Sequence, residues 1–374
     1  MKKAFVCILL LVVAGGLFSQ QFSFSGLVNG GLSLVKLDGE DDPVYGLIAK
    51  NQEGNGVRAQ FNIIGTNADE NAGVDIRIRA VGGGSNTFRD DFQFRHAYGW
   101  VSFRNNILRV LGGRINGNDF NTLDQITDGA TLYDSFGLLA YINPVKELKI
   151  GAGAYTPQRL GEGLGIDEVS GYAGLGVNLP DLLNLRAQLS GKKNDVKALV
   201  SARFLAVKNI PIEVTARLTG LSEFGDAGTM SFYERVGFNA ISNLSLNLAA
   251  AQSISQADDT DLFFRGWFWL TYDLGNIVPR LDVNYITGGK FTTGAGLGVN
   301  ASYNTDYEKG AYTYDKDHAF LTVSPSVQFK VAANTFVELG YLFGKDMSGS
   351  DKAAIGNKNG GVNHAAFADL RVSF

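Results

Sequence analysis

The 374-residue sequence contains one cysteine, three histidines and seven prolines, and no apolar run reaches the ~20 residues of a membrane-spanning helix. Because Cys7 stands alone, the chain cannot close an internal disulfide. The histidines do not form a metal-spaced cluster, and there is no GxSxG nucleophile motif. These absences argue against an enzyme, a metalloprotein and a helical membrane protein, and we expect no cofactor and no bound metal.

The composition instead favours many short strands. The chain has 47 glycines, 25 phenylalanines and 14 tyrosines, a balance that suits strands with aromatic ends better than an ordinary globular core. Its formal net charge of -4 argues against nucleic acid as a partner. Because no composition break or linker divides the chain after its first residues, we predict a single domain.

The first twenty residues have the pattern of a secretory signal peptide. Lys2 and Lys3 precede an apolar run from Ala4 to Phe18, and small residues follow up to Ser19. A membrane-anchor helix is the alternative, but the run is too short to cross a bilayer. We therefore predict a signal peptide over residues 1–20, with cleavage near Ser19 or Gln20, and one exported domain over residues 21–374.

The rest of the chain alternates between apolar and polar residues in runs of about nine to twelve, close to the ~9–11 residues of a tilted transmembrane strand. Short connections alternate with longer polar ones, as in outer-membrane barrels. Stretches around Tyr45 and from Gly294 to Tyr303 fit either strand or loop, so sixteen strands is the alternative to eighteen. The eighteen predicted strands are 22–35, 57–65, 73–81, 92–103, 106–114, 136–143, 148–156, 169–179, 184–191, 196–206, 211–220, 231–241, 244–254, 262–273, 279–288, 319–330, 335–344 and 364–374.

Alternation also indicates which face of each strand is wet. Within 73–81, Asp75, Arg77 and Arg79 share one face and aliphatic residues share the other. An arginine facing lipid at mid-bilayer costs roughly 2–4 kcal/mol, so the charged face must look inward. The same division recurs in 211–220 and 279–288. The sequence therefore predicts an all-β, closed antiparallel barrel, wide enough at 16 to 18 strands to hold water.

The last eleven residues, HAAFADLRVSF, place alanines, Leu370, Val372 and Phe374 on one face of a strand and mostly polar residues on the other. This pattern resembles the closing strand of bacterial outer-membrane β-barrels. The resemblance implies insertion in outer-membrane lipid, short periplasmic turns, long outer loops, and recognition of Phe374 by the barrel-assembly machinery.

The stretch from Arg95 to Phe120 resembles a porin in its order of aromatic strand, tight turn, glycine-rich strand and long loop. The resemblance implies a water-filled channel for small hydrophilic solutes and ions, and it suggests a homotrimer. It also implies that the third outer loop folds into the barrel and narrows the pore. That loop would run from Asn116 to Ser135, and it carries four acidic residues: Asp119, Asp124, Asp128 and Asp134.

A basic wall would face that loop. We predict that it consists of five arginines on the preceding strands: Arg58, Arg77, Arg79, Arg95 and Arg109. An acidic loop opposite a basic wall would set a transverse field across the narrowest point of the pore. The alternative is that the aspartates are solvated loop charges and that the arginines pair with neighbouring strand residues.

Other functions also have to be considered. A surface adhesin or antigen that uses the barrel as a platform is the main alternative, supported by long loops over Gly289–His318 and Lys345–Asn363. A transporter of hydrophobic solutes or a barrel enzyme fits less well, because we find no apolar stripe facing the lumen and no catalytic set. We interpret His96 as a structural strand residue and the glycines of GAGAYTP, Gly151 to Pro157, as close-packed strand glycines.

Overall fold

The computed structural model describes residues 21–36, 44–48, 58–81, 93–104, 106–115, 120, 135–156, 169–192, 195–221, 228–255, 262–287, 290–293, 299–302, 319–346 and 362–374. Its strands are β1 (Gln21–Lys36), β2 (Val44–Ile48), β3 (Arg58–Thr66), β4 (Ala72–Val81), β5 (Gln93–Phe103), β6 (Leu108–Ile115), β7 (Ser135–Val145), β8 (Leu148–Thr156), β9 (Ser170–Leu179), β10 (Leu183–Lys192), β11 (Asp195–Phe204), β12 (Ile212–Thr219), β13 (Thr229–Phe238), β14 (Leu244–Ser255), β15 (Leu262–Tyr272), β16 (Ile277–Thr287), β17 (Lys290–Thr293), β18 (Val299–Ser302), β19 (Ala319–Ala332), β20 (Thr335–Asp346) and β21 (Val362–Ser373). Among these residues, no helix is long and apolar enough to cross a membrane.

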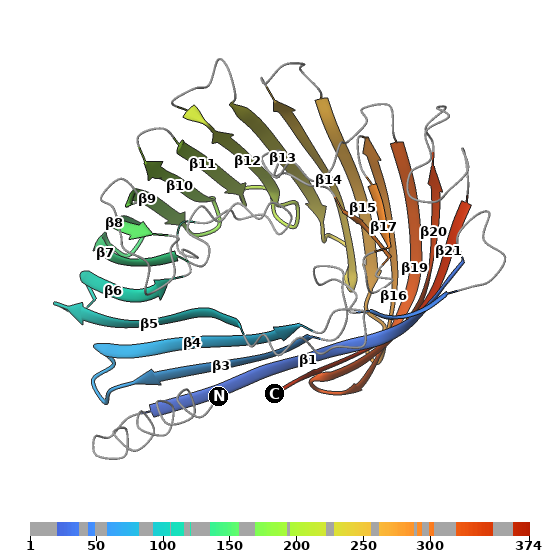
Figure 1. Ribbon diagram of the computed structural model, residues 1–374, viewed down its shortest axis with the longest axis horizontal. Coiled ribbons are helices and arrows are strands. Elements are labelled where there is room, and N and C mark those ends of the chain that lie inside the picture. Colours follow the sequence, from blue (N-terminus) through green and yellow to red (C-terminus); the bar gives the residue numbers. More distant parts are fainter. Residues whose placement is uncertain are drawn as a thin grey trace.

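The strands form a closed antiparallel barrel of 18 wall strands, as the sequence predicts (Figure 1). Each wall strand pairs with its chain neighbours, and β1 closes the ring. The first part of β1 pairs with β3 from Gln21 opposite Thr66, and its second part pairs with β21 up to Lys36 opposite His364. The prediction of eighteen strands is confirmed.

The two ambiguous stretches do form strands, but outside the ring of eighteen. Strand β2 pairs with the end of β1, from Gly31 opposite Ile48 to Val35 opposite Val44, along the edge that β3 leaves uncovered. Strands β17 and β18 pair only with each other. Neither stretch adds a strand to the wall, so their ambiguity does not change the count of eighteen.

Short turns gather at one rim of the barrel, and their sequences fit the backbone that they adopt. Left-handed φ angles occur at Arg104, Asn106, Asp181, Asn209 and Asn243, all in connections between paired strands. Asparagine and aspartate tolerate this conformation better than other residues with a β-carbon. Because outer-membrane barrels turn tightly on the periplasmic side, we assign this rim to the periplasm.

Outward-facing aromatic residues mark the same rim. They are the last or nearly last residues of strands that end there: Phe103, Phe204, Phe238, Tyr272, Phe329 and Phe374. Apart from Phe238, which is half-buried, all of them are exposed, and Phe374 is 56% exposed. Such a girdle is expected where the apolar band of a barrel meets the headgroups of the bilayer. We call these six residues the lower girdle.

The predicted inward and outward faces are confirmed in the wall. On β12, Glu213 and Thr215 are buried, while Val214 between them is 38% exposed. On β21, Asp369 is buried and Leu370 is 46% exposed. The polar face looks inward because a charged group that faced lipid would lose its hydration. Inside the barrel it contacts other polar groups and the water of the lumen.

Candidate functional site

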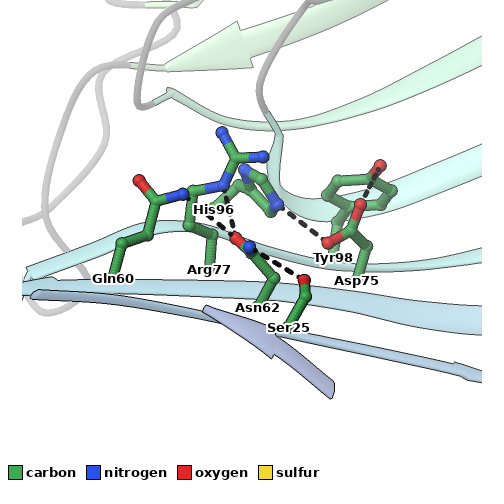
Figure 2. Close-up of polar contacts among 7 residues, drawn as sticks. All are labelled: Ser25, Gln60, Asn62, Asp75, Arg77, His96 and Tyr98. Carbon is green, nitrogen blue, oxygen red and sulfur yellow. Dashed lines mark hydrogen bonds and ion pairs between the residues drawn. The ribbon is translucent and has the colours of Figure 1, made fainter. Parts of the chain in front are cut away.

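A polar network covers the lumen wall on β1, β3, β4 and β5 (Figure 2). The Asp75 carboxylate lies 2.8 Å from His96 Nε2, and its other oxygen accepts a hydrogen bond of 3.1 Å from the Tyr98 hydroxyl. His96 is buried and its ring lies against that of Tyr98. Asp75 thus fixes two neighbouring side chains of β5, in agreement with a structural role for His96.

Two arginines of the predicted basic wall are held in this network by neutral amides. Arg77 Nε donates a 2.8 Å hydrogen bond to the side-chain oxygen of Asn62, whose amide nitrogen donates to the Ser25 hydroxyl. Arg79 donates through Nε and Nη2, at 3.4 and 3.3 Å, to the side-chain oxygen of Gln60. The alternative expectation for these arginines is pairing with neighbouring strand residues, and Arg77 and Arg79 do bond to residues of the neighbouring strand β3. The amides orient the guanidinium groups without cancelling their charge.

The remaining predicted wall arginines differ in their settings. The Arg109 guanidinium lies 4.0 Å from the centre of the Trp100 ring, a cation–π contact on the lumen face. Arg58 begins β3, opposite Asn29, and Arg95 is the extra residue of a bulge between β4 and β5. The side chains of Arg58 and Arg95 lie outside the described part of the chain. At Arg95 the bulge also interrupts the alternation from which an inward orientation is predicted.

Asp119, Asp124, Asp128 and Asp134 lie outside the described residues, but Phe120 beside Asp119 is described. Its side chain is fully buried, at 0% exposed. Its ring packs edge-on against Tyr141, with centroids 5.4 Å apart, and lies 5.9 Å from the ring of Tyr172. Both tyrosines are on inward-facing positions, so this one residue of the third outer loop is seated on the inner wall.

The seat of Phe120 is made by glycines. A β-carbon added at Gly151 on β8 would lie 2.7 Å from a carbon of the Phe120 ring, and one added at Gly174 on β9 would lie 2.6 Å from it. The two glycines face each other across the β8–β9 pair. Any larger residue at these positions would occupy the space of the ring, so the glycine-rich sequence here is explained by close packing.

Sequence reasoning missed that part of the lumen wall is apolar. A buried cluster joins β6, β7 and β9 to Phe120, and its members are Leu111, Ile115, Phe120, Leu139, Tyr141 and Tyr172. It contradicts the expectation that no apolar patch faces the lumen. The available signal was the alternation in β7, where Leu139 and Tyr141 fall on the inward face between exposed Leu138 and Ile142. That strand is apolar on both faces, so hydrophobicity alone could not identify its inner face.

Across the barrel, β11, β12 and β13 hold their arginines with a carboxylate. Glu213, which is 0% exposed, receives Arg203 Nε and Arg235 Nη2 on one oxygen, the latter at 2.7 Å. One step along the same strands, the hydroxyls of Ser201 and Thr215 are 2.7 Å apart and buried. A similar arrangement joins Arg280 to Glu338, which also accepts a hydrogen bond from Ser326.

The geometry can be compared with known proteins. No protein-family model and no curated protein matches the sequence. Among solved structures, the fold is similar to three outer-membrane porins of Pseudomonas aeruginosa. OccK11 superposes with a TM-score of 0.54 at 10% identity, covering 94% of this chain and 96% of that one. OprD gives 0.54 at 9% identity, with 95% and 96% covered, and OpdO gives 0.54 at 10%, with 95% and 97% covered. At such low identity the likeness concerns the fold, and the chain has the fold of an 18-stranded outer-membrane porin barrel.

Proposed function

We propose that this protein is a porin of a bacterial outer membrane, a water-filled channel through which small hydrophilic solutes and ions diffuse. The barrel fold shared with porins supports this proposal, as does an inner wall lined with charged and hydroxyl side chains. The porins to which it is similar are channels and not enzymes, which supports a non-catalytic role. Membrane lipid and passing solutes are then its expected partners.

The observation that carries the proposal of a narrowed pore is the buried ring of Phe120. This residue follows β6 in the third outer loop, and it contacts the inner face of β7, β8 and β9. The position of Phe120 on the inner wall supports a loop that runs inside the barrel at this point. We infer that the loop from Asn116 to Ser135 narrows the channel and that Phe120 anchors it.

The charge on the wall favours anionic solutes. Arg77 donates to the Asn62 amide, which leaves its positive charge in place, and Arg79 lies on the same inward face of β4. Arg186 and Arg217 add guanidinium groups at inward positions of β10 and β12. We propose that the loop carries four acidic residues opposite this wall: Asp119, Asp124, Asp128 and Asp134. The loop would then favour cations, whereas the wall favours anions.

Conductance through planar bilayers tests the anchor. Phe120→Ala removes the ring from its seat and, since a buried Phe→Ala change typically costs 3–5 kcal/mol, it should release the loop. We expect a larger single-channel conductance. Gly174→Ala should act in the same direction, because its β-carbon takes the place of the ring. Phe232→Ala, an exposed residue of the lipid face, is the matched control and should leave conductance unchanged.

Reversal potentials test the charges. Replacing the four loop aspartates by asparagine should shift selectivity toward anions, and replacing Arg77 and Arg79 by glutamine should shift it toward cations. If folded protein conducts and neither set shifts the potential, the constriction lies elsewhere. If it does not conduct at all, the channel proposal is replaced by the alternative, a surface adhesin or antigen that uses the barrel as a platform. Residues 303–318 and 347–361, most of the loops on which that reading rests, lie outside the described chain.

Assembly remains a proposal of its own. Phe374 closes the ring by two backbone hydrogen bonds with Gly26, and its side chain lies against Phe61 in the lower girdle. We propose that the assembly machinery reads this terminal residue. Export by a signal peptide over residues 1–20 and assembly into trimers also stay predictions.

A further inference from the structure

One acidic side chain faces the wrong way for a barrel in lipid. Glu234 lies on β13 between Tyr233, which is buried, and Arg235, which bonds to Glu213 in the lumen wall. Alternation therefore turns Glu234 outward, where it is exposed. Among the strand side chains that the structure describes, it is the one carboxylate on the outward face.

The depth of Glu234 follows from the lower girdle. Strand β13 ends at Phe238, a girdle residue, and Glu234 precedes it by four positions. At about 3.3 Å per residue and a tilt of about 40°, Glu234 lies about 10 Å above the girdle. The apolar band of a barrel is about 25 Å tall, so the carboxylate is near the middle of the membrane. The outward Arg114 and Lys345, in contrast, lie at the loop ends of β6 and β20.

Glu234 has a polar neighbour on the next strand. In the β13–β14 pair, Glu234 is opposite Ala250 and Phe232 is opposite Gln252, which places Gln252 diagonally beside Glu234 on the same outward face. No hydrogen bond or ion pair joins either side chain to another described residue. A carboxylate and a carboxamide thus stand together in the apolar band with donors and acceptors to spare.

Small residues border this pair on β12 and β15, although Val214 lies directly opposite Glu234 on β12. Ala216 on β12 and Gly266 on β15 lie on the same outward face, and Ala250 lies between Glu234 and Gly266 in register. Small residues let another backbone approach closely, and polar side chains at such places join proteins within membranes. Intramembrane carboxylates are rare and as a rule have a partner.

From these observations we propose that the outward face of β12 to β15, centred on Glu234 and Gln252, is where a second copy of this chain packs. Around a symmetry axis normal to the membrane, two copies bring the same patch together. The Gln252 amide of one copy can then donate to the Glu234 carboxylate of the other, and the reverse. Because the patch carries both donor and acceptor, it is self-complementary, as a contact at a symmetry axis requires. This proposal is independent of whether the barrel conducts.

Cysteine cross-linking in lipid vesicles tests the contact. The sequence has one cysteine, so Ala250→Cys in a Cys7→Ser background gives a single-cysteine protein that keeps both Glu234 and Gln252. Ala97→Cys is the matched control, since Ala97 faces outward on β5, on the far side of the ring. Under oxidation at a low protein-to-lipid ratio, we expect the Ala250→Cys protein to form several-fold more cross-linked dimer than the control.

A second variant separates association from folding. Changing both Glu234 and Gln252 to leucine fits the lipid face, so the barrel should stay folded, as judged by its heat-modifiable gel shift. Single-molecule photobleaching in bilayers should then show monomers, where the wild type shows oligomers. A wild type that is monomeric or trimeric in bilayers, or cross-linking at position 97 with none at 250, would overturn the proposal.

Discussion

Opposite sides of the lumen hold their arginines in different ways (Figure 1). On β4, Arg77 and Arg79 bond to the amides of Asn62 and Gln60 (Figure 2). On β11 and β13, Arg203 and Arg235 share the buried carboxylate of Glu213. Both arrangements fix a long side chain against the wall, but they leave different charges.

The difference teaches how the wall of a barrel can divide structure from selectivity. The Glu213 carboxylate cancels one of the two positive charges that it holds, and removing it would leave both arginines without their partner. An amide accepts the hydrogen bond and leaves the guanidinium positive, at the expense of a weaker contact. We infer that the wall near β12 mainly stabilises the barrel, while the wall near β4 mainly acts on passing ions.

The largest effect should come from breaking the carboxylate wall. Glu213→Gln keeps the shape of the side chain, and its carbonyl oxygen can still accept both hydrogen bonds, but it removes the negative charge between two guanidinium groups. Breaking a buried pair costs about 3–5 kcal/mol, and since Arg203 is 30% exposed to the lumen we expect about 3 kcal/mol, the lower end. Unfolding by urea in lipid vesicles measures this loss.

Asp195→Asn is the matched control for that experiment. Asp195 lies on the adjacent strand β11 and pairs with Lys197 at 3.7 Å, but its side chain is 46% exposed, whereas that of Glu213 is 0% exposed. A pair of this kind contributes about 0–1 kcal/mol. Similar losses from the two variants would contradict a special role for Glu213.

A smaller effect, on selectivity alone, should follow from converting the amide wall into a carboxylate wall. Asn62→Asp with Gln60→Glu changes almost no volume and places a negative charge on each arginine. We expect the reversal potential to move toward cations, although both arginines remain. Asn239→Asp, which adds a charge at the exposed rim, is the control. A channel whose reversal potential ignores the double change would show that this wall does not line the ion path.

Much of this comparison could be predicted from the sequence. Period-two alternation predicts the inward orientation of Asp75, Arg77 and Arg79, because a charged face cannot look into lipid. It also predicts the strand ranges to within a few residues. The partners are another matter: Asn62 lies opposite Arg77 because the turn after β3 sets the register, and register is not visible in composition or alternation.

The contacts of Phe120 and of Glu213 could not be predicted from the sequence, for different reasons. Phe120 belongs to a loop, where no periodicity assigns a face. Glu213 is correctly predicted to face inward, but its bond to Arg235 depends on how β12 and β13 align across a long outer connection. Contacts that join distant or irregular segments are set by the closed ring as a whole, and local patterns do not encode them.

The smallest effect should come from an ion pair outside both walls, at the periplasmic rim. Lys330 Nζ lies 2.7 Å from Asp273, and its hydrogen bond, helped by the Gly275 N–H, lowers the pKa of Asp273 below its ordinary 3.8. A lowered pKa means that the charged form favours folding, so this contribution is present at neutral pH and is lost as the pH falls through the lowered value. Because water screens the pair, Asp273→Asn should reduce the urea midpoint only slightly at neutral pH, and the reduction should vanish once the pH is below the lowered pKa of Asp273. A difference that persists in acid would mean that Asp273 acts through its turn geometry, as an acceptor for Gly275, and not through its charge.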